Sequence, residues 1–340
     1  MPIFPPKISL ARIPTPIERL ERLGREWEVD LRVKRDDLTG STLGGNKVRK
    51  LEYLLADAVN QGGDTVITCG AVTSNHARAT ALAARALGLD AWLVLAGAPP
   101  AAADGNLQLD LLAGARVIYI TWDEFHEHLG EVLSRLAEDL KQQGKKPYII
   151  PTGGSNAVGI LGYVEAAREI KDQCADLGWQ PDCLVCAVGS GGTYAGLYLG
   201  NALESMAERV IGITVCQDAD YFQPRILREA SRAARMLQSG LTLDPGGITL
   251  VDGYAGAGYA KTSPEQLRLL RHAAEREGLI LDPVYTGKAF AGVRGEIANG
   301  SIPRGSRVLF LHTGGIFGLS AFTGEMAGMW DSLTYWPDLY

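Results

Sequence analysis

The chain has 340 residues, of which 33 are Lys or Arg and 39 are Asp or Glu, so its net charge is −6. A slightly acidic chain without a polybasic block is not expected to bind nucleic acid, and no run reaches the ~18 apolar residues of a membrane span. The 41 glycines follow no three-residue period, which excludes a collagen-like chain. Five scattered cysteines suit a reducing compartment, and we expect a cytoplasmic protein of about two domains.

Short β-rich runs alternate with helical patterns along most of the chain. The predicted strands span 65–69, 91–95, 116–120, 148–150, 183–188, 210–216, 248–252 and 307–311. The predicted helices span 76–87, 106–113, 124–143, 157–171, 194–205, 224–238 and 264–277. Such alternation is typical of βαβ units, whose parallel sheets carry helices on both faces. The fold class is therefore α/β, with two series of units that indicate two doubly wound parallel-sheet domains.

The segment Gly44-Gly-Asn-Lys47 comes just before a predicted helix. Most lysines on helices are simply solvated. A lysine near a helix N-terminus, however, has its cationic form disfavoured by the helix dipole. This environment favours the free amine that Schiff-base chemistry needs, so Lys47 is a candidate catalytic residue.

A second motif, Ser74-Asn75-His76, follows the predicted strand 65–69 and opens the next helix. Ser and Asn are common N-cap residues, and a histidine here is more often structural than catalytic. Taken alone, this motif does not distinguish a helix cap from a binding site.

The turn Gly189-Ser190-Gly191-Gly192-Thr193 follows the strand 183–188 and opens another helix. Glycines at a helix N-terminus expose backbone N–H groups that can hold a phosphate. The turn lacks the lysine of a nucleotide-triphosphate loop, and Tyr194 stands where the dinucleotide pattern has its third glycine. A phosphate cradle and a plain tight turn both remain open.

Cys183 and Cys186 form a lone CxxC inside the same predicted strand. On a strand, a spacing of three points the two sulfurs to opposite faces, and no second pair completes a zinc site. We expect both to be buried structural cysteines, with no metal bound.

Six motifs together resemble the D-cysteine desulfhydrase and 1-aminocyclopropane-1-carboxylate (ACC) deaminase family. These are pyridoxal-phosphate enzymes of fold type II, with the tryptophan-synthase-β-like fold. The motifs are Lys34-Arg-Asp-Asp37, Gly44-Gly-Asn-Lys47-Val-Arg-Lys-Leu-Glu52, Ser74-Asn-His76, the 189–193 turn, Asp282-Pro-Val-Tyr-Thr-Gly-Lys288 and His312-Thr-Gly-Gly315. The resemblance implies a homodimer whose subunit has a small domain, 51–159, and a large pyridoxal-phosphate-binding domain, 1–50 and 160–340.

The resemblance also implies roles for individual residues toward pyridoxal 5'-phosphate and a small amino-acid substrate. Lys47 would bind the cofactor covalently and act in catalysis with Ser74 and Tyr285. Asn75 would bind the cofactor phenolate oxygen. Gly189, Ser190, Gly191, Gly192 and Thr193 would hold the phosphate. Ser74, Asn75, His76, Tyr259 and Tyr285 would contact the substrate.

Two further cofactor-binding positions separate activities within the family. ACC deaminases carry Glu and Leu where this chain has Thr286 and Thr313. A carboxylate near the pyridine nitrogen keeps it protonated, whereas a threonine hydroxyl can only hydrogen-bond, so the electron sink is shallower. We therefore expect a carbon–sulfur lyase that converts D-cysteine to pyruvate, ammonia and hydrogen sulfide, in preference to ACC deamination.

Two other functions remain as alternatives. L-cysteate sulfo-lyase chemistry would release sulfite instead of sulfide, and Arg78 is the candidate extra cation for it. A non-catalytic pyridoxal-phosphate-binding protein is disfavoured, because Lys47, Tyr285 and the phosphate turn are all present.

Overall fold

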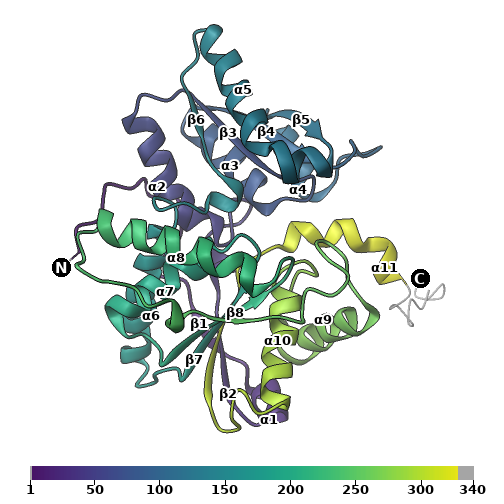
Figure 1. Ribbon diagram of the computed structural model, residues 1–340. Helices are drawn as coiled ribbons and strands as arrows, with labels where there is room; N and C mark the ends of the chain where they lie inside the picture. The colour runs from purple at the N-terminus through teal and green to yellow at the C-terminus, as the bar shows by residue number, and fades with distance from the viewer. Residues whose placement is uncertain (1, 328–340) are drawn as a thin grey trace, which may run out of the picture.

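Two separate sheets organise the computed structural model, which describes residues 2–327 (Figure 1). The six-stranded sheet has the order β1-β2-β10-β7-β8-β9, and the four-stranded sheet has the order β5-β4-β3-β6. The strands are β1 Ile17–Arg19, β2 Asp30–Lys34, β3 Thr65–Ala71, β4 Asp90–Ala96, β5 Arg116–Ile120, β6 Pro147–Ile149, β7 Cys183–Val188, β8 Arg209–Thr214, β9 Thr249–Val251 and β10 Arg307–Leu311. The β1–β2 pair is antiparallel and the other pairs are parallel, which confirms the predicted α/β class with two parallel sheets.

Helices connect the parallel strands, as βαβ units require. The α-helices are α1 Glu21–Trp27, α2 Lys47–Asn60, α3 Asn75–Ala86, α4 Gly105–Leu112, α5 Leu129–Gln142, α6 Leu161–Asp176, α7 Gly192–Glu204, α8 Ala219–Met236, α9 Pro264–Glu277, α10 Thr286–Ala298 and α11 Thr323–Ala327. Short helical turns are η1 Asp36–Leu38, η2 Glu124–His128, η3 Thr152–Gly154, η4 Pro245–Gly247 and η5 Ile316–Phe322.

Both faces of the six-stranded sheet are covered. One core contains side chains of α6, α7 and α8, and the other contains side chains of α1, α9 and α10. Cys186 lies in the first core and Cys183 in the second, and both are buried and free. The alternation of strand β7 therefore confirms the prediction of two structural cysteines on opposite faces.

The smaller sheet has its own cores, one with α2, α3 and α4 and the other with α5. It runs from Thr65 to Ile149, while the domain boundaries at 51 and 159 stay a prediction. The end of the predicted large domain, 328–340, lies outside the described residues.

Several elements were not predicted from the sequence. The edge strand β1 has only three residues, and β2 alternates Asp, Arg and Lys with apolar residues. The predicted helix 124–143 begins as the π-helical turn η2 before α5, and α6 begins at Leu161 instead of 157. Among the described helices, each falls short of the length or apolarity that crossing a bilayer requires.

A buried polar network fastens the first turns of α2 to the larger sheet. The Arg49 guanidinium donates to both oxygens of Asp36, at 2.8 and 2.9 Å, and to both oxygens of Glu169 on α6, at 2.8 and 2.9 Å. Lys34 on β2 also donates to Glu169, at 2.5 Å. Burial alone would raise the pKa of Asp36, but Arg49 holds that pKa at about 2. Two cations thus neutralise two carboxylates at the base of α2.

We expect Arg49→Met to destabilise the protein by about 3–5 kcal/mol, because it leaves the buried Asp36 carboxylate without its paired cation. Urea unfolding measures the loss. Arg135→Met, on the exposed face of α5, is the control and should stay within about 0.5 kcal/mol of the parent. Equal stabilities of the two variants would contradict an anchoring role for Arg49.

Candidate active site

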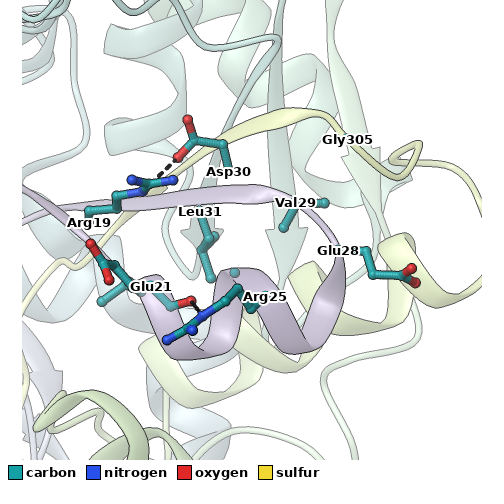
Figure 2. A pocket seen from close by; sticks show the side chains of 10 residues that line it. Arg19, Glu21, Arg25, Glu28, Val29, Asp30, Leu31 and Gly305 are labelled. Atoms are coloured by element: carbon teal, nitrogen blue, oxygen red, sulfur yellow. Dashed lines mark hydrogen bonds and ion pairs between the residues drawn. The ribbon is translucent and has the colours of Figure 1, made fainter.

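The predicted site residues follow the carboxyl ends of parallel strands, which is where ligands bind in open α/β sheets. The 189–193 turn follows β7, Thr313 follows β10, and Ser74 follows β3. A pocket of about 320 Å³ lies instead at the amino ends of β2 and β10. Two of its arginines are engaged within the pocket (Figure 2): Arg19 forms an ion pair with Asp30 at 3.5 Å, and Arg25 donates to the Glu21 backbone carbonyl at 3.3 Å. This pocket does not contain the predicted residues.

The N-terminus of α7 has the features of an anion cradle. The N-cap Gly191 has a φ of 80°, a left-handed conformation that favours glycine, and no side chain caps the helix. The Ser190 hydroxyl lies 2.9 Å from that of Ser155, and the Thr193 hydroxyl accepts a hydrogen bond from the Asn46 amide at 2.9 Å. Uncapped N–H groups and nearby hydroxyls suit a phosphate.

A second buried lysine, Lys50, faces this helix end and was missed by the sequence analysis. Its ammonium donates to the Gly153 carbonyl at 3.1 Å and to the Ser155 hydroxyl at 3.3 Å. A Cβ added to Gly192 would lie 2.8 Å from the Lys50 Nζ. Among the described residues no carboxylate pairs with Lys50, and burial, followed by repulsion from Lys47, lowers its pKa well below the usual value. A phosphate would supply the missing counter-charge.

Lys47 is the first residue of α2 and lies three positions before Lys50, so the two side chains share one helix face. Burial lowers the pKa of Lys47 to about 8, against an opposing effect of Asp282. More of its amine is therefore neutral near physiological pH than for an ordinary lysine. The i, i+3 spacing of Lys47 and Lys50 was the sequence signal that could have identified Lys50.

The Ser74-Asn75-His76 motif begins α3, where the Ser74 hydroxyl accepts from the Ala77 N–H at 3.1 Å. Asn106 on α4 donates its amide hydrogens to the Asn75 Oδ1 at 2.9 Å and to the Thr73 carbonyl at 2.8 Å. Asn75 consequently keeps its own amide N–H groups available for a ligand. Asn106 was not predicted, because only the packing of α4 against α3 brings it there.

His76 is buried, and its Nε2 lies 2.9 Å from the Thr68 hydroxyl. That hydroxyl donates to the Ile150 carbonyl at 2.9 Å, so it accepts from an Nε2–H of the histidine. Burial, with repulsion from Lys47 and Lys50, lowers the pKa of His76 well below its usual value. The ring is therefore neutral.

Tyr285 and Tyr259 form a hydroxyl pair with oxygens 2.8 Å apart. A Cβ on Gly189 would lie 2.7 Å from the Tyr285 ring, so the phosphate turn and Tyr285 are in close contact. Burial raises the pKa of both phenols, and their shared hydrogen bond raises the pKa of Tyr285 further and lowers that of Tyr259. Both stay protonated at neutral pH and remain hydrogen-bond donors.

The Thr286 hydroxyl is engaged by Asp282, so its proton is not free for a ligand. This hydroxyl donates to the Asp282 Oδ1 at 2.6 Å and accepts from the Asp282 N–H at 2.8 Å. The other Asp282 oxygen accepts from the N–H groups of Val284 and Tyr285, both at 2.9 Å. Thr313 is buried, and its carbonyl accepts from the Asn46 N–H at 3.0 Å.

Arg78 is buried and turned toward the loop that precedes Lys47. It donates to the carbonyls of Thr42 and Gly44, the latter at 3.0 Å, and its guanidinium lies 4.9 Å from the centre of the Phe317 ring. These contacts hold the loop and disfavour a role as an additional substrate-binding cation.

The residues present fit pyridoxal phosphate. The N-terminus of α7 with Lys50 suits its phosphate, and the partly neutral amine of Lys47 suits its aldehyde. Asn75 has a free amide donor beside them.

Comparisons with known proteins agree with this fit. A model of the family "Pyridoxal-phosphate dependent enzyme" matches residues 8–314. The chain is 42% identical over 335 residues to a bifunctional D-cysteine desulfhydrase/1-aminocyclopropane-1-carboxylate deaminase of Arabidopsis thaliana, covering 94% of this chain and 81% of the relative. It is 40% identical over 326 residues to a D-cysteine desulfhydrase of Klebsiella pneumoniae, covering 93% and 96%.

A solved structure described as an ACC deaminase homologue has a TM-score of 0.88 at 42% identity, and the match covers 95% of this chain and 96% of that one. The chain therefore belongs to the pyridoxal-phosphate dependent enzymes of the tryptophan-synthase-β-like fold, among the lyases of the D-cysteine desulfhydrase and ACC deaminase family.

Proposed function

We propose that this enzyme is a D-cysteine desulfhydrase, which converts D-cysteine and water to pyruvate, ammonia and hydrogen sulfide. The observation that carries the proposal is the environment of position 286. A threonine occupies it, and its hydroxyl is already bonded to Asp282. No carboxylate from this position can therefore protonate a pyridine ring, so chemistry that needs a deep electron sink is disfavoured.

The substrate choice follows from how much carbanion stabilisation each reaction requires. Bound pyridoxal phosphate supplies an electron sink that makes the α-proton of an amino acid acidic. Thiolate is a good leaving group from the β-carbon, so its elimination needs less help from the protein than opening a cyclopropane. A relative at 40% identity bears the name D-cysteine desulfhydrase alone, which supports the same choice, whereas the name of the relative at 42% identity includes both activities.

In this proposal, Lys47 holds the cofactor and later removes the α-proton of the substrate. The lowered pKa makes its neutral amine available as the base. Tyr285, kept protonated by burial, donates a hydrogen bond or proton to the departing sulfur, and Tyr259 orients the Tyr285 hydroxyl.

The start of α3 would bind the substrate carboxylate, with N–H groups of the loop as donors. Ser74 keeps its hydroxyl proton for the substrate, since that oxygen only accepts from Ala77. Neutral His76 contacts the substrate without adding charge, and Asn75 binds the cofactor phenolate oxygen through the amide group that Asn106 leaves free. The 189–193 turn and Lys50 hold the phosphate, and Thr313 is the cofactor contact near the ring nitrogen.

The oligomer and location are further parts of the proposal. We propose a cytoplasmic homodimer, as the family resemblance implies. Sulfite elimination from L-cysteate is the alternative reaction, and the engagement of Arg78 with loop carbonyls argues against it.

An assay of pyruvate and sulfide with D-cysteine, L-cysteine, L-cysteate and ACC tests the substrate. We expect D-cysteine to be turned over with the highest kcat/KM. Lys47→Ala should lower turnover by at least about 10³-fold, because it removes both the cofactor attachment and the base. Lys141→Ala, an exposed lysine on α5, is the matched control and should keep full activity. Preference for L-cysteate or ACC would overturn the proposal.

The pH dependence of cofactor attachment tests the lowered pKa of Lys47. Covalent attachment needs the neutral amine, so its second-order rate with apoenzyme should rise with pH and level off above about 8. Absorbance in stopped flow follows the reaction. Nα-acetyl-lysine, whose amine has a usual pKa of about 10.4, should continue to react faster at still higher pH. Parallel profiles for enzyme and free amine would rule out the shifted pKa.

Lys50→Met tests the predicted phosphate contact. Loss of one charge-assisted hydrogen bond of about 1.5–3 kcal/mol should weaken the equilibrium binding of pyridoxal phosphate roughly 10- to 150-fold. The apoenzyme itself should be no less stable, because the substitution removes a buried amine that no described carboxylate neutralises. Equilibrium dialysis and urea unfolding give the two quantities, with Lys141→Met as control. Unchanged cofactor affinity would exclude Lys50 from the phosphate site.

A further inference from the structure

A third buried lysine lies outside all of these contacts. Lys288, on the first turn of α10, is completely buried. Its ammonium donates to three backbone carbonyls, those of Ala255 and Gly258 at 2.7 Å and that of Val215 at 3.3 Å. An ammonium has three N–H donors, so this group is fully satisfied by main-chain oxygens.

The three carbonyls belong to two segments that meet at the active site. Val215 directly follows β8, and its N–H donates to the last residue of β7, just before the phosphate turn. Ala255 and Gly258 lie in the loop that leads to Tyr259. Lys288 thus joins the end of the larger sheet to the residue before Tyr259.

The loop 253–260 connects β9 to α9 without a helix or strand of its own. Gly253, Gly256, Gly258 and Ala260 all have positive φ values between 53° and 120°. The carbonyls of Ala255 and Gly258 each accept one backbone N–H at 3.3 Å, from Gly258 and Lys261, and each accepts a second, shorter hydrogen bond from the Lys288 ammonium. The remaining described contacts of the loop include the bond of Tyr254 to Glu296 at 2.8 Å and the bond between Tyr259 and Tyr285.

A cluster of inward-facing carbonyls is also how proteins hold a potassium ion, which has the same charge as an ammonium and similar size. We propose that the Lys288 ammonium is a built-in monovalent cation that fixes the Tyr259 loop and makes the enzyme independent of external potassium or ammonium. Lys288 is a positioning residue in this role, since it acts on substrate through Tyr259. The substrate-facing role of Tyr259 rests on the proposed function. The carbonyl cage, by which we mean the three carbonyls of Val215, Ala255 and Gly258 around the Lys288 ammonium, does not.

Lys288→Ala tests the cage, because it leaves the three carbonyls and a space the length of the lost side chain. In sodium-free buffer with a large, excluded cation such as tetramethylammonium, we expect a lower unfolding temperature and kcat/KM reduced about 10- to 100-fold, mainly through KM. Potassium, ammonium or n-propylammonium should restore both quantities. Wild-type enzyme should respond to none of these cations.

Lys288→Met is the matched control, since its side chain fills the space without supplying a charge. It should show the same losses with no rescue by any cation. Rescue of the methionine variant to the same extent, or failure of every small cation to rescue the alanine variant, would overturn the proposal. An alanine variant with wild-type KM and unfolding temperature would do so as well.

If the alanine variant does not fold, Lys288→Gln replaces it, because its amide can donate to two of the three carbonyls. A folded glutamine variant with raised KM is expected, and an unchanged KM would overturn the proposal. Binding of amino acids is followed by the change in cofactor absorbance, so the readout does not depend on D-cysteine being the substrate. If wild-type enzyme does not turn over D-cysteine but small cations still restore the unfolding temperature of Lys288→Ala, the proposed function is wrong and the proposal for Lys288 is supported.

Discussion

The bidentate ion pair between Arg49 and Asp36 determines where the chemistry can take place. A buried carboxylate or guanidinium is strongly destabilising without a partner of opposite charge. The pairing of Arg49 with Asp36 therefore fixes the position of α2 against the larger sheet. Arg49 lies between Lys47 and Lys50 in sequence but points to the opposite side. The same helical turn therefore binds the larger sheet through Arg49 and places the Lys50 amine at the N-terminus of α7.

Four basic side chains in this protein show how the surrounding groups determine the role of an arginine or a lysine. Arg49 is paired with carboxylates and is structural. Lys288 is enclosed by carbonyls and, in our proposal, acts as a fixed cation. Lys50 donates only to a carbonyl and a hydroxyl, neither of which neutralises its charge. Burial therefore lowers its pKa, and an anionic ligand would supply the counter-charge. Burial lowers the pKa of Lys47 to about 8 against the opposing charge of Asp282, which favours the reactive neutral amine.

Asp282 and Asn106 show a related principle for uncharged contacts. Asp282 accepts four hydrogen bonds from the turn that begins α10, which positions Tyr285 and occupies the Thr286 hydroxyl. Asn106 uses its donors on Thr73 and Asn75, which leaves the Asn75 donors for a ligand. Asp282 and Asn106 thus determine which polar atoms of the site remain free to bind a ligand. Because Asp282 occupies the Thr286 hydroxyl, it also supports the proposed choice of substrate.

Local patterns in the sequence were enough to predict every parallel strand except β2, the helices that follow Gly44-Gly-Asn46 and Ser74, the opposite faces of Cys183 and Cys186, and the family. These features depend on residues close together in the chain, such as glycine turns and the period-2 alternation of β7. The roles of Lys50, Asn106 and Lys288 were not predicted, because their partners lie 30 or more positions away in the chain. The hydrogen bond between Thr286 and Asp282 was not predicted either, because its geometry depends on the turn that begins α10. Residue type and spacing therefore determined the class of chemistry, whereas only tertiary packing decided which polar groups are satisfied by protein and which remain for a ligand, because hydrogen bonding in a buried site is settled by three-dimensional proximity.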